Sequence, residues 1–227
     1  MSPVASVAAA GVLRSFAARH PRRGGGSRSG RSYAVTLLLP INPGAETDLA
    51  AHLDGLGTGD DSPMAKLRHV HFARWVVIDQ LKMDWPGAPS RPSRLKSQYL
   101  LFTATVTARV DEHVKLPEQR HAEQLPESFF RELCARIPDE VDAILRYCHG
   151  YPGSSDADAF VCYLSAGQLD TSFLHVGYPD VTVDEVRQAL AARNRFVAFV
   201  RDHQGERDAT RLHQAYLQES STWFRLR

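Results

Sequence analysis

The fold is decided by residues 67–79, which read Leu-Arg-His-Val-His-Phe-Ala-Arg-Trp-Val-Val-Ile-Asp. Two sets of side chains alternate along this stretch. The first set is Val70, Phe72, Arg74, Val76 and Ile78, and the second is His69, His71, Ala73, Trp75 and Val77. Successive side chains of a β-strand point to opposite faces of its sheet, so this period of two predicts a strand. One face of the strand is apolar except for its arginine.

Three shorter runs rich in β-branched and apolar side chains lie outside this stretch. Residues 33–39 come before it, and residues 99–108 and 171–177 come after it. Such runs are typical of strands when proline, glycine or aspartate bounds them. The sequence therefore predicts four strands in all.

Helices are predicted between and after these strands. Apolar side chains recur at helical spacing in residues 46–56 and in residues 129–148, where Pro138 marks a kink or a new first turn. Thr182 and Glu185 have the spacing of a capping box, which predicts a helix start. This last helix carries Val186, Leu190, Val197 and Val200.

The order of these elements is strand, helix, strand, strand, helix, strand, followed by C-terminal helices. This βαββαβ order predicts an α+β, ferredoxin-like fold with helices on one face of an antiparallel sheet. The other sheet face must also be covered, because it carries apolar side chains. A second subunit would cover it, so the sequence predicts a homodimer.

Composition places the predicted domain at residues 33–227, behind a basic tail at residues 1–32. The chain has 227 residues and a net charge of +1. The first 32 residues hold six arginines and no acidic residue, so all 26 acidic residues lie beyond them. The domain itself is mildly acidic, which argues against a nucleic-acid-binding surface.

The tail has two interpretations. Its Arg-rich and Ser-rich composition without acids resembles an organellar transit peptide, and it also suits a low-complexity extension that is dispensable for folding. Apolar runs are too short to span a bilayer. Three cysteines without metal-type spacing indicate a reducing compartment. From these features we predict a cytoplasmic protein with no membrane partner, and cysteines that belong to apolar helical faces.

Three short motifs carry a resemblance to a known group of proteins. They are Val-His-Phe-Ala-Arg-Trp-Val-Val at residues 70–77, Leu-Leu-Phe-Thr at residues 100–103 and Cys-His-Gly-Tyr-Pro at residues 148–152. Together they resemble a bacterial family of ferredoxin-like proteins of the dimeric α+β barrel superfamily. Relatives in that superfamily include haem-binding dye-decolorising peroxidases, chlorite dismutase-like proteins and cofactor-free antibiotic-biosynthesis monooxygenases.

The chain departs from the family pattern in two places. Residues 105–108 read Thr-Val-Thr-Ala where an Asn-aromatic-Asp-Gly turn is expected. The Gly-x-x-Asp-Gly motif of the peroxidases is also absent from the sequence. Chemistry that depends on those acidic residues is therefore not implied for this chain.

Arg74 is the first candidate site residue. Strand alternation places it among apolar side chains, where a buried guanidinium needs an anionic partner. That partner is either a ligand, such as a carboxylate or a haem propionate, or a protein carboxylate such as Glu112 or Asp142. In the first case Arg74 binds substrate or cofactor, and in the second it belongs to the core.

Histidines supply the other candidates. His71 shares a strand face with His69, and His113 or His175 could complete a metal site, although two polar side chains at an interface explain the pair equally well. We predict no metal. His175 is a candidate haem ligand or general base by analogy with related barrels, or else a core histidine. His149 follows a helix and is expected to stabilise its C-terminal carbonyls.

The leading hypothesis is an enzyme that oxidises or isomerises a small molecule in a pocket between sheet and helices, with haem as a candidate cofactor. Arg74, His71 and His175 would line that pocket as catalytic residues, and His175 and Arg74 would bind the cofactor. Two alternatives use the same scaffold. One is a non-catalytic protein that binds or senses a small ligand, and the other is a structural module that only dimerises.

Overall fold

The computed structural model describes residues 26–80, 94–107 and 118–223. The chain divides into two compact units, Met1–Asp180 and Val181–Arg227. The strands are β1 (Arg28–Ser29), β2 (Ser32–Pro40), β3 (Val70–Gln80) and β4 (Arg94–Thr107). The helices are α2 (Glu46–Asp54), α3 (Glu118–Arg136), α4 (Pro138–Leu145), α5 (Ala157–Gly167), α6 (Val183–Asp202) and α7 (Ala209–Ser220), with 3-10 turns η1 (Gly59–Asp61) and η2 (Pro63–Lys66). No helix within these described ranges is long and apolar enough to cross a membrane.

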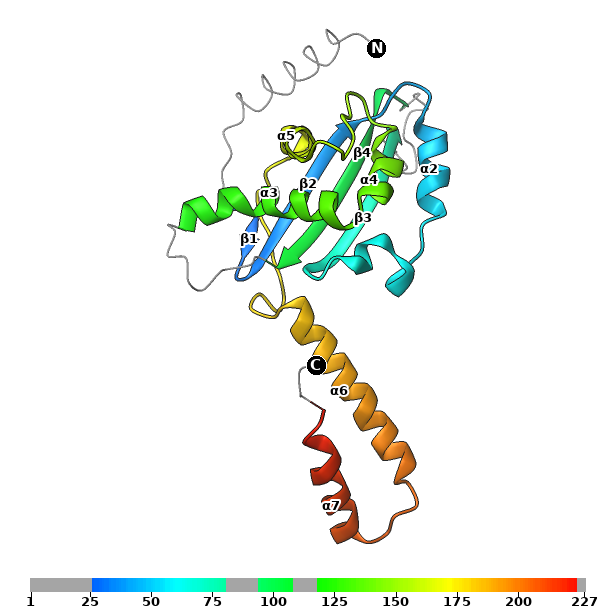
Figure 1. The fold of residues 1–227 in the computed structure, drawn as a ribbon, viewed down its shortest axis with the longest axis vertical. Helices are drawn as coiled ribbons and strands as arrows, with labels where there is room; N and C mark the ends of the chain where they lie inside the picture. Colours follow the sequence, from blue (N-terminus) through cyan, green and yellow to red (C-terminus); the bar gives the residue numbers. More distant parts are fainter. Residues whose placement is uncertain (1–25, 81–93, 108–117, 224–227) are drawn as a thin grey trace, which may run out of the picture. The chain divides into compact units, whose positions relative to one another are not determined.

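The sheet of the first unit has four strands in the order β1-β2-β4-β3, and every neighbouring pair is antiparallel. The predicted strands at residues 33–39, 67–79 and 99–108 correspond to β2, β3 and β4 (Figure 1). Phe102 of the central strand β4 pairs with Leu37 on one side and with Trp75 on the other. The α+β class is confirmed.

The predicted strand at residues 171–177 is wrong. In its place the chain leaves α5 and meets β2 at a single antiparallel bridge between Gln168 and Leu37, and Leu169 then donates its N–H to the Thr36 carbonyl at 2.8 Å. Residues 171–177 continue without regular structure. β1 pairs with Ser32 and Tyr33 at the start of the same β2 edge.

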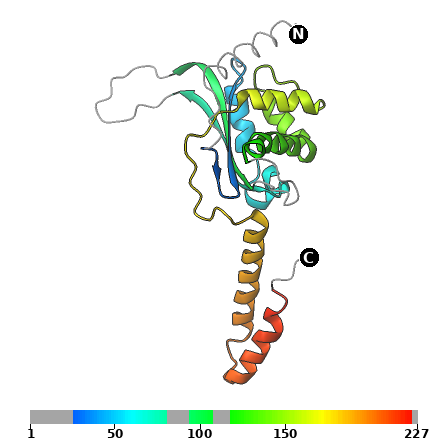
Figure 2. The ribbon, with the colours of Figure 1, turned by 90° about the vertical axis from the view of Figure 1, so that its left-hand side faces the viewer.

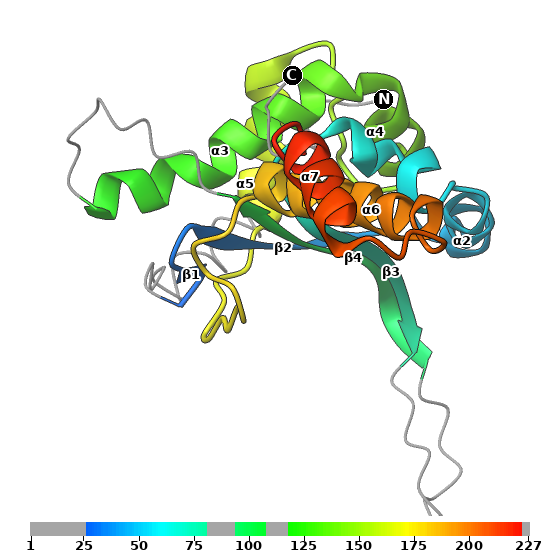
Figure 3. The ribbon, with the colours of Figure 1, turned by 90° about the horizontal axis from the view of Figure 1, so that it is seen from below.

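The helices of the first unit, α2, α3, α4 and α5, lie on one face of the sheet (Figures 2 and 3). We call this the inner face. The side chains that it buries are Val35, Leu37, Leu39, Leu100, Phe102, Ala104 and Val106. They pack against Phe129, Phe130, Leu133, Val141, Ile144, Phe160 and Leu164 of the helices. This core accounts for the helical pattern predicted at residues 129–148.

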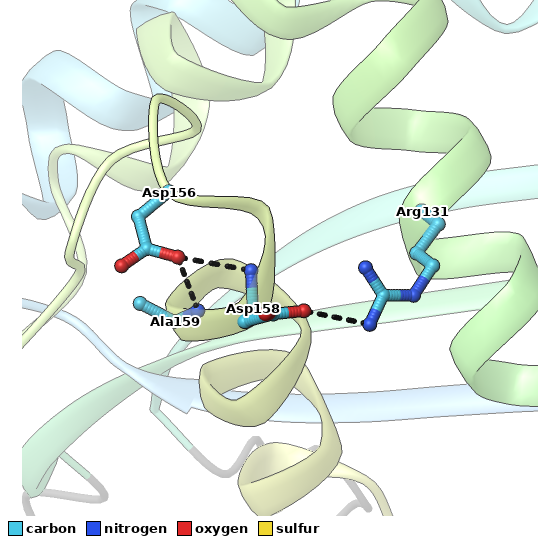
Figure 4. A network of polar contacts seen from close by, with 4 residues as sticks. All are labelled: Arg131, Asp156, Asp158 and Ala159. Carbon is cyan, nitrogen blue, oxygen red and sulfur yellow. Dashed lines mark hydrogen bonds and ion pairs between the residues drawn. The ribbon is translucent and has the colours of Figure 1, made fainter.

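Helix α5 was not predicted, although its start carries a clear signal. Asp156 is the N-cap, and its Oδ1 accepts the backbone N–H groups of Asp158 and Ala159, both at 3.0 Å. Asp158 in turn accepts a hydrogen bond from Arg131 of α3 at 2.7 Å (Figure 4). Both side chains of this ion pair are exposed, so it contributes little to stability beyond orienting α5 beside α3.

The second unit is a helical hairpin of α6 and α7. The predicted capping box is confirmed, because Thr182 Oγ1 accepts from the Glu185 N–H at 3.2 Å and Glu185 Oε2 accepts from the Thr182 N–H at 2.7 Å. The buried side chains of the hairpin are Ala192, Phe199 and Trp223. The sequence predicted one domain at residues 33–227, and this second unit is a separate compact body.

The predicted tail boundary after residue 32 cuts through the hairpin of β1 and β2. Ser27 is 2% exposed and lies inside the predicted tail. Its carbonyl accepts the Ala34 N–H at 2.8 Å, and its Oγ accepts the Thr171 N–H at 3.2 Å. Residues 26–32 therefore belong to the folded unit, whereas residues 1–25 lie outside the described chain.

We predict that a variant beginning at Tyr33 melts at least about 3 °C below a variant beginning at Gly26. The shorter variant loses β1 and the hydrogen bonds of Ser27, and a loss of about 1 kcal/mol lowers the Tm of a chain of this size by about 2–4 °C. Thermal unfolding followed by circular dichroism measures the difference. Equal melting temperatures would mean that β1 adds nothing to stability.

Candidate functional site

Aromatic side chains fill the space between the sheet and the helices. Phe102 lies 4.2 Å from Trp75 and 6.4 Å from Phe129, measured between ring centroids, and Phe129 lies 6.1 Å from Phe130. Phe102 and Phe130 are fully buried. Core residues therefore occupy this part of the space between the sheet and the helices, where the sequence predicted a pocket.

Arg74 lies on the opposite face of the sheet and is exposed. Its Nε donates to Oγ1 of Thr103 at 3.1 Å. The expectation that Arg74 is buried with an anionic side chain is wrong. Asp142 binds other groups, and Glu112 lies outside the described residues.

An irregularity in β3 explains this error. The register with β4 shifts between Val70 and Phe72, so Val70 packs on the inner core while Phe72 points away from it. Arg74 then shares the outer face with Phe72, Val76 and neighbouring side chains of β2 and β4. The larger apolar side chains on this outer face include Leu38, Phe72, Val76, Ile78, Tyr99 and Leu101. Phe72 is 52% exposed and Val76 is 37% exposed.

His71 occupies the irregular position itself. Its Nε2 lies 2.7 Å from Oγ1 of Thr107 on β4, and partial burial lowers the pKa of the imidazole below its ordinary value. His175 lies in the irregular segment after α5 and is exposed. The hydrogen bonds of His71 and Arg74 thus go to β4, and nothing in the described chain joins His175 to them.

A metal site is not formed by these histidines. Within the described residues no group of three or more His, Cys, Asp or Glu side chains is arranged to hold a metal ion. His113 lies outside that part of the chain. His149 has a structural role, since its N–H donates to the Pro40 carbonyl at 2.8 Å and its carbonyl accepts from Tyr163 at 3.3 Å. It connects the segment after α4 to β2.

The structure contains a groove that sequence reasoning did not find, at the outer edge of β3. It has a volume of about 360 Å³ and lies between β3, the end of α2 and the two 3-10 turns. Its lining residues are Leu53, Asp54, Leu56, Gly57, Thr58, Gly59, Ser62, Pro63, Met64, Ala73, Arg74 and Trp75. This volume is at the lower end of the range of small-molecule sites, about 300–1,000 Å³.

Hydrogen-bond donors dominate the polar part of this edge groove. Trp75 Nε1 is buried and makes no hydrogen bond within the described chain. Arg74 uses its Nε for Thr103, and the remaining guanidinium N–H groups make no hydrogen bond to described residues. Ser62 Oγ accepts from the Met64 N–H at 3.3 Å, which leaves its hydroxyl proton available to donate. The groove thus pairs apolar walls with donors that lack an acceptor.

A Gly-rich stretch at the end of α2 borders the groove. Gly55, Gly57 and Gly59 follow α2 closely, and a Cβ at Gly57 would come within 2.5 Å of the Asp61 carbonyl oxygen. A side chain at this position would force the loop apart. Closely spaced glycines in the sequence can indicate a loop whose backbone segments pack tightly. The sequence alone does not show which elements such a loop faces.

The loop after α4 depends on the carboxylate of Asp142. Asp142 Oδ1 accepts from the Tyr151 hydroxyl at 2.5 Å and from the Ser154 N–H at 2.9 Å, and Oδ2 accepts from Ser154 Oγ at 2.8 Å. Burial and the bond to Asp142 both raise the pKa of Tyr151. The Tyr-Pro motif at residues 151–152 is therefore fixed by a structural carboxylate.

Two of the three cysteines are core residues, as predicted. Cys148 is buried, and burial raises the pKa of its thiol to about 12. Cys134 donates to the Ser154 carbonyl at 3.1 Å, and burial raises its pKa as well. Cys162 departs from the prediction because it is exposed on α5.

Comparison with known proteins adds no relative: no family model, curated protein or solved structure matches this chain. The resemblance to the dimeric α+β barrel superfamily stays a prediction.

We predict that Asp142→Ala lowers the free energy of unfolding by about 2–4 kcal/mol. The change removes a charged acceptor of three hydrogen bonds and leaves the partly buried Tyr151 hydroxyl without its partner. Urea unfolding measures the loss, with Asp60→Ala, at an exposed turn position, as a control expected to stay within about 0.5 kcal/mol. A loss for Asp142→Ala no larger than that of the control would contradict the structural role.

Proposed function

We propose that this chain is a small-molecule-binding protein whose ligand occupies the edge groove. The observation that carries the proposal is a groove that presents the guanidinium of Arg74 and is also lined by Trp75, whose buried Nε1 makes no hydrogen bond within the described chain. A buried donor without an acceptor costs free energy, and a ligand that supplies an acceptor removes this cost. This corresponds to the second of the sequence-based hypotheses, a protein that binds or senses a small ligand.

The side chains that line the groove favour a small apolar molecule that carries an anionic group or a strong hydrogen-bond acceptor. Leu53, Leu56 and Met64 supply the apolar surface. Arg74 and Trp75 supply donors that match a carboxylate, which accepts several hydrogen bonds at once. The volume of about 360 Å³ suits a single-ring or short-chain molecule better than a macrocycle.

Oxidative or isomerising catalysis, with or without haem, stays a prediction for this chain. The ionisable side chains that line the groove are Asp54 and Arg74. Asp54 is the lining side chain that could accept a proton from a bound molecule, and it is exposed. Ligand binding is therefore the part of the original hypothesis that these residues support most directly.

We also propose that two copies pair through the outer face of the sheet, as in the dimeric α+β barrel and ferredoxin-like arrangement expected from the sequence. The supporting observation is the exposure of Phe72 and Val76 on that face, next to half-buried Leu101 and Ile78. An exposed apolar sheet face of this kind is normally covered by a partner. A second copy of this chain can cover the face, so no other protein is required.

The groove is tested with phenylacetate as an anionic apolar probe and phenylacetamide as its neutral isostere. The chain has three tryptophans, so the indole N–H resonances in a ¹H-¹⁵N spectrum can be assigned with Trp75→Phe. We expect phenylacetate to shift the Trp75 resonance saturably in the millimolar range and phenylacetamide to bind about tenfold more weakly. Arg74→Gln should weaken the binding of phenylacetate by a similar factor. Arg68 lies outside the groove, so Arg68→Gln should leave this affinity unchanged. An unmoved Trp75 resonance would refute the proposed site.

The sheet pairing is tested by sedimentation of Val76→Lys. Two lysines would be buried in each dimer, so the dissociation constant should rise by about 100-fold or more. Ala135→Lys, at an exposed position of α3 on the helical layer, is the matched control and should leave association unchanged. A monomeric parent protein at micromolar concentration, or an unaffected Val76→Lys variant, would exclude pairing through this face.

A further inference from the structure

Helix α6 carries a second apolar stripe that the hairpin itself does not use. The exposed aliphatic side chains of this stripe are Val186, Leu190, Val197 and Val200, which are 41%, 52%, 44% and 44% exposed. With Arg193 they follow the spacing four, three, four, three. That is the a/d pattern of a coiled-coil seam. We call these five residues the α6 stripe.

The stripe lies apart from the side of α6 that meets α7. Ala192 and Phe199 are buried in the hairpin together with Trp223. Phe199 lies 6.0 Å from Trp223 and 5.9 Å from Tyr216, measured between ring centroids. At 100° per residue, Ala192 and Phe199 lie more than about 80° around the helix from every stripe residue. Phe196 lies between the two sides, is 46% exposed and has its ring centroid 5.9 Å from that of Trp223, so the stripe is the part of the apolar surface of α6 that α7 leaves exposed.

The hairpin needs a further contact for its stability. Four side chains are buried in the described part of this unit, Val183, Ala192, Phe199 and Trp223. A unit of this length with so small a core is marginal in water, because it buries too little apolar surface to offset its conformational entropy. Its helices are nevertheless well specified, with a capping box at Thr182 and an N-cap at Asp208. Strong local signals with a small core are typical of an element that completes its core by association.

We propose that the α6 stripe pairs antiparallel with the α6 stripe of a second copy of this chain, so that two hairpins form a four-helix bundle. In a heptad register, antiparallel pairing brings Val186 of one copy opposite Val197 of the other, and Leu190 opposite Arg193. The aliphatic stem of each Arg193 covers Leu190, and its guanidinium extends to water. Bundles of two antiparallel hairpins are a common solution for such helices.

Charge along α6 selects a second copy and the antiparallel direction. The first half holds Asp184, Glu185 and Arg187, a net charge of −1, whereas the second half holds Arg193, Arg195, Arg201 and Asp202, a net charge of +2. Antiparallel pairing places the acidic first turn of each helix near Arg201 of the other, and it also opposes the helix dipoles favourably. Parallel pairing would place like charges side by side. The surface is thus complementary to itself, as a twofold interface requires.

The proposal is tested by disulfide crosslinking between two differently labelled copies of the full chain. Both copies carry Cys162→Ser, which removes the exposed native thiol. One copy carries Val186→Cys and the other Val197→Cys, and mild oxidation of their mixture should give the mixed disulfide as the main product. Each variant oxidised alone should give at least about fivefold less dimer, because neither cysteine meets its own copy in this register.

Ala191→Cys mixed with Ala198→Cys is the matched control. Both positions are exposed on α6, more than about 80° around the helix from the stripe, so crosslinking should stay at the level of random collision. Leu190→Lys gives an independent measurement and should reduce the mixed disulfide about tenfold or more. Equal yields for stripe and control pairs would overturn the proposal, and so would preferential self-crosslinking of Val186→Cys, which would indicate parallel pairing. The sheet-face dimer is tested separately, because neither cysteine lies on the sheet.

Discussion

The contact on which the first unit depends is the stack of Phe102 between Trp75 and Phe129. Phe102 sits on the central strand and pairs in register with both neighbouring strands, and its ring extends to α3. One side chain therefore joins three strands to the helical layer. Because these rings are closely packed, this part of the space between sheet and helices serves stability.

The edge groove follows from this constraint. Trp75 turns its ring toward the core, while its neighbour Arg74 turns outward, because successive strand residues face opposite ways. Only at the free edge of β3 can both residues border one groove. The end of α2 and the two 3-10 turns wrap this edge, and they keep it from pairing with another strand. The same elements therefore lie along a sheet edge and form the walls of the groove.

Most of the sheet and its helical layer could be predicted from the sequence, because strong alternation and helical spacing reflect burial directly. The sheet face on which Arg74 lies could not be predicted, since both faces of β3 carry large apolar side chains. The register shift after Val70 also does not alter the alternation of apolar residues in the sequence. The strand expected at residues 171–177 had adequate β propensity, but β1 and the bridge at Gln168 pair with the β2 edge. Helix α5 was missed even though Asp156 offered an N-cap, because its apolar run is short and glycine-bounded. The groove lies between elements that are distant in sequence, so no local pattern indicates it.

Among the described residues, two of the exposed apolar surfaces are the outer sheet face with Phe72 and Val76, and the α6 stripe with Leu190 and Val197. Each surface belongs to a different compact unit of the same chain. If both pair with copies of themselves, the first pairing raises the effective concentration for the second. Pairing of both surfaces between the same two chains then costs less entropy than recruiting a third chain, and it leaves no surface open for further growth. Self-complementary surfaces on both units thus favour a closed dimer over an extended assembly.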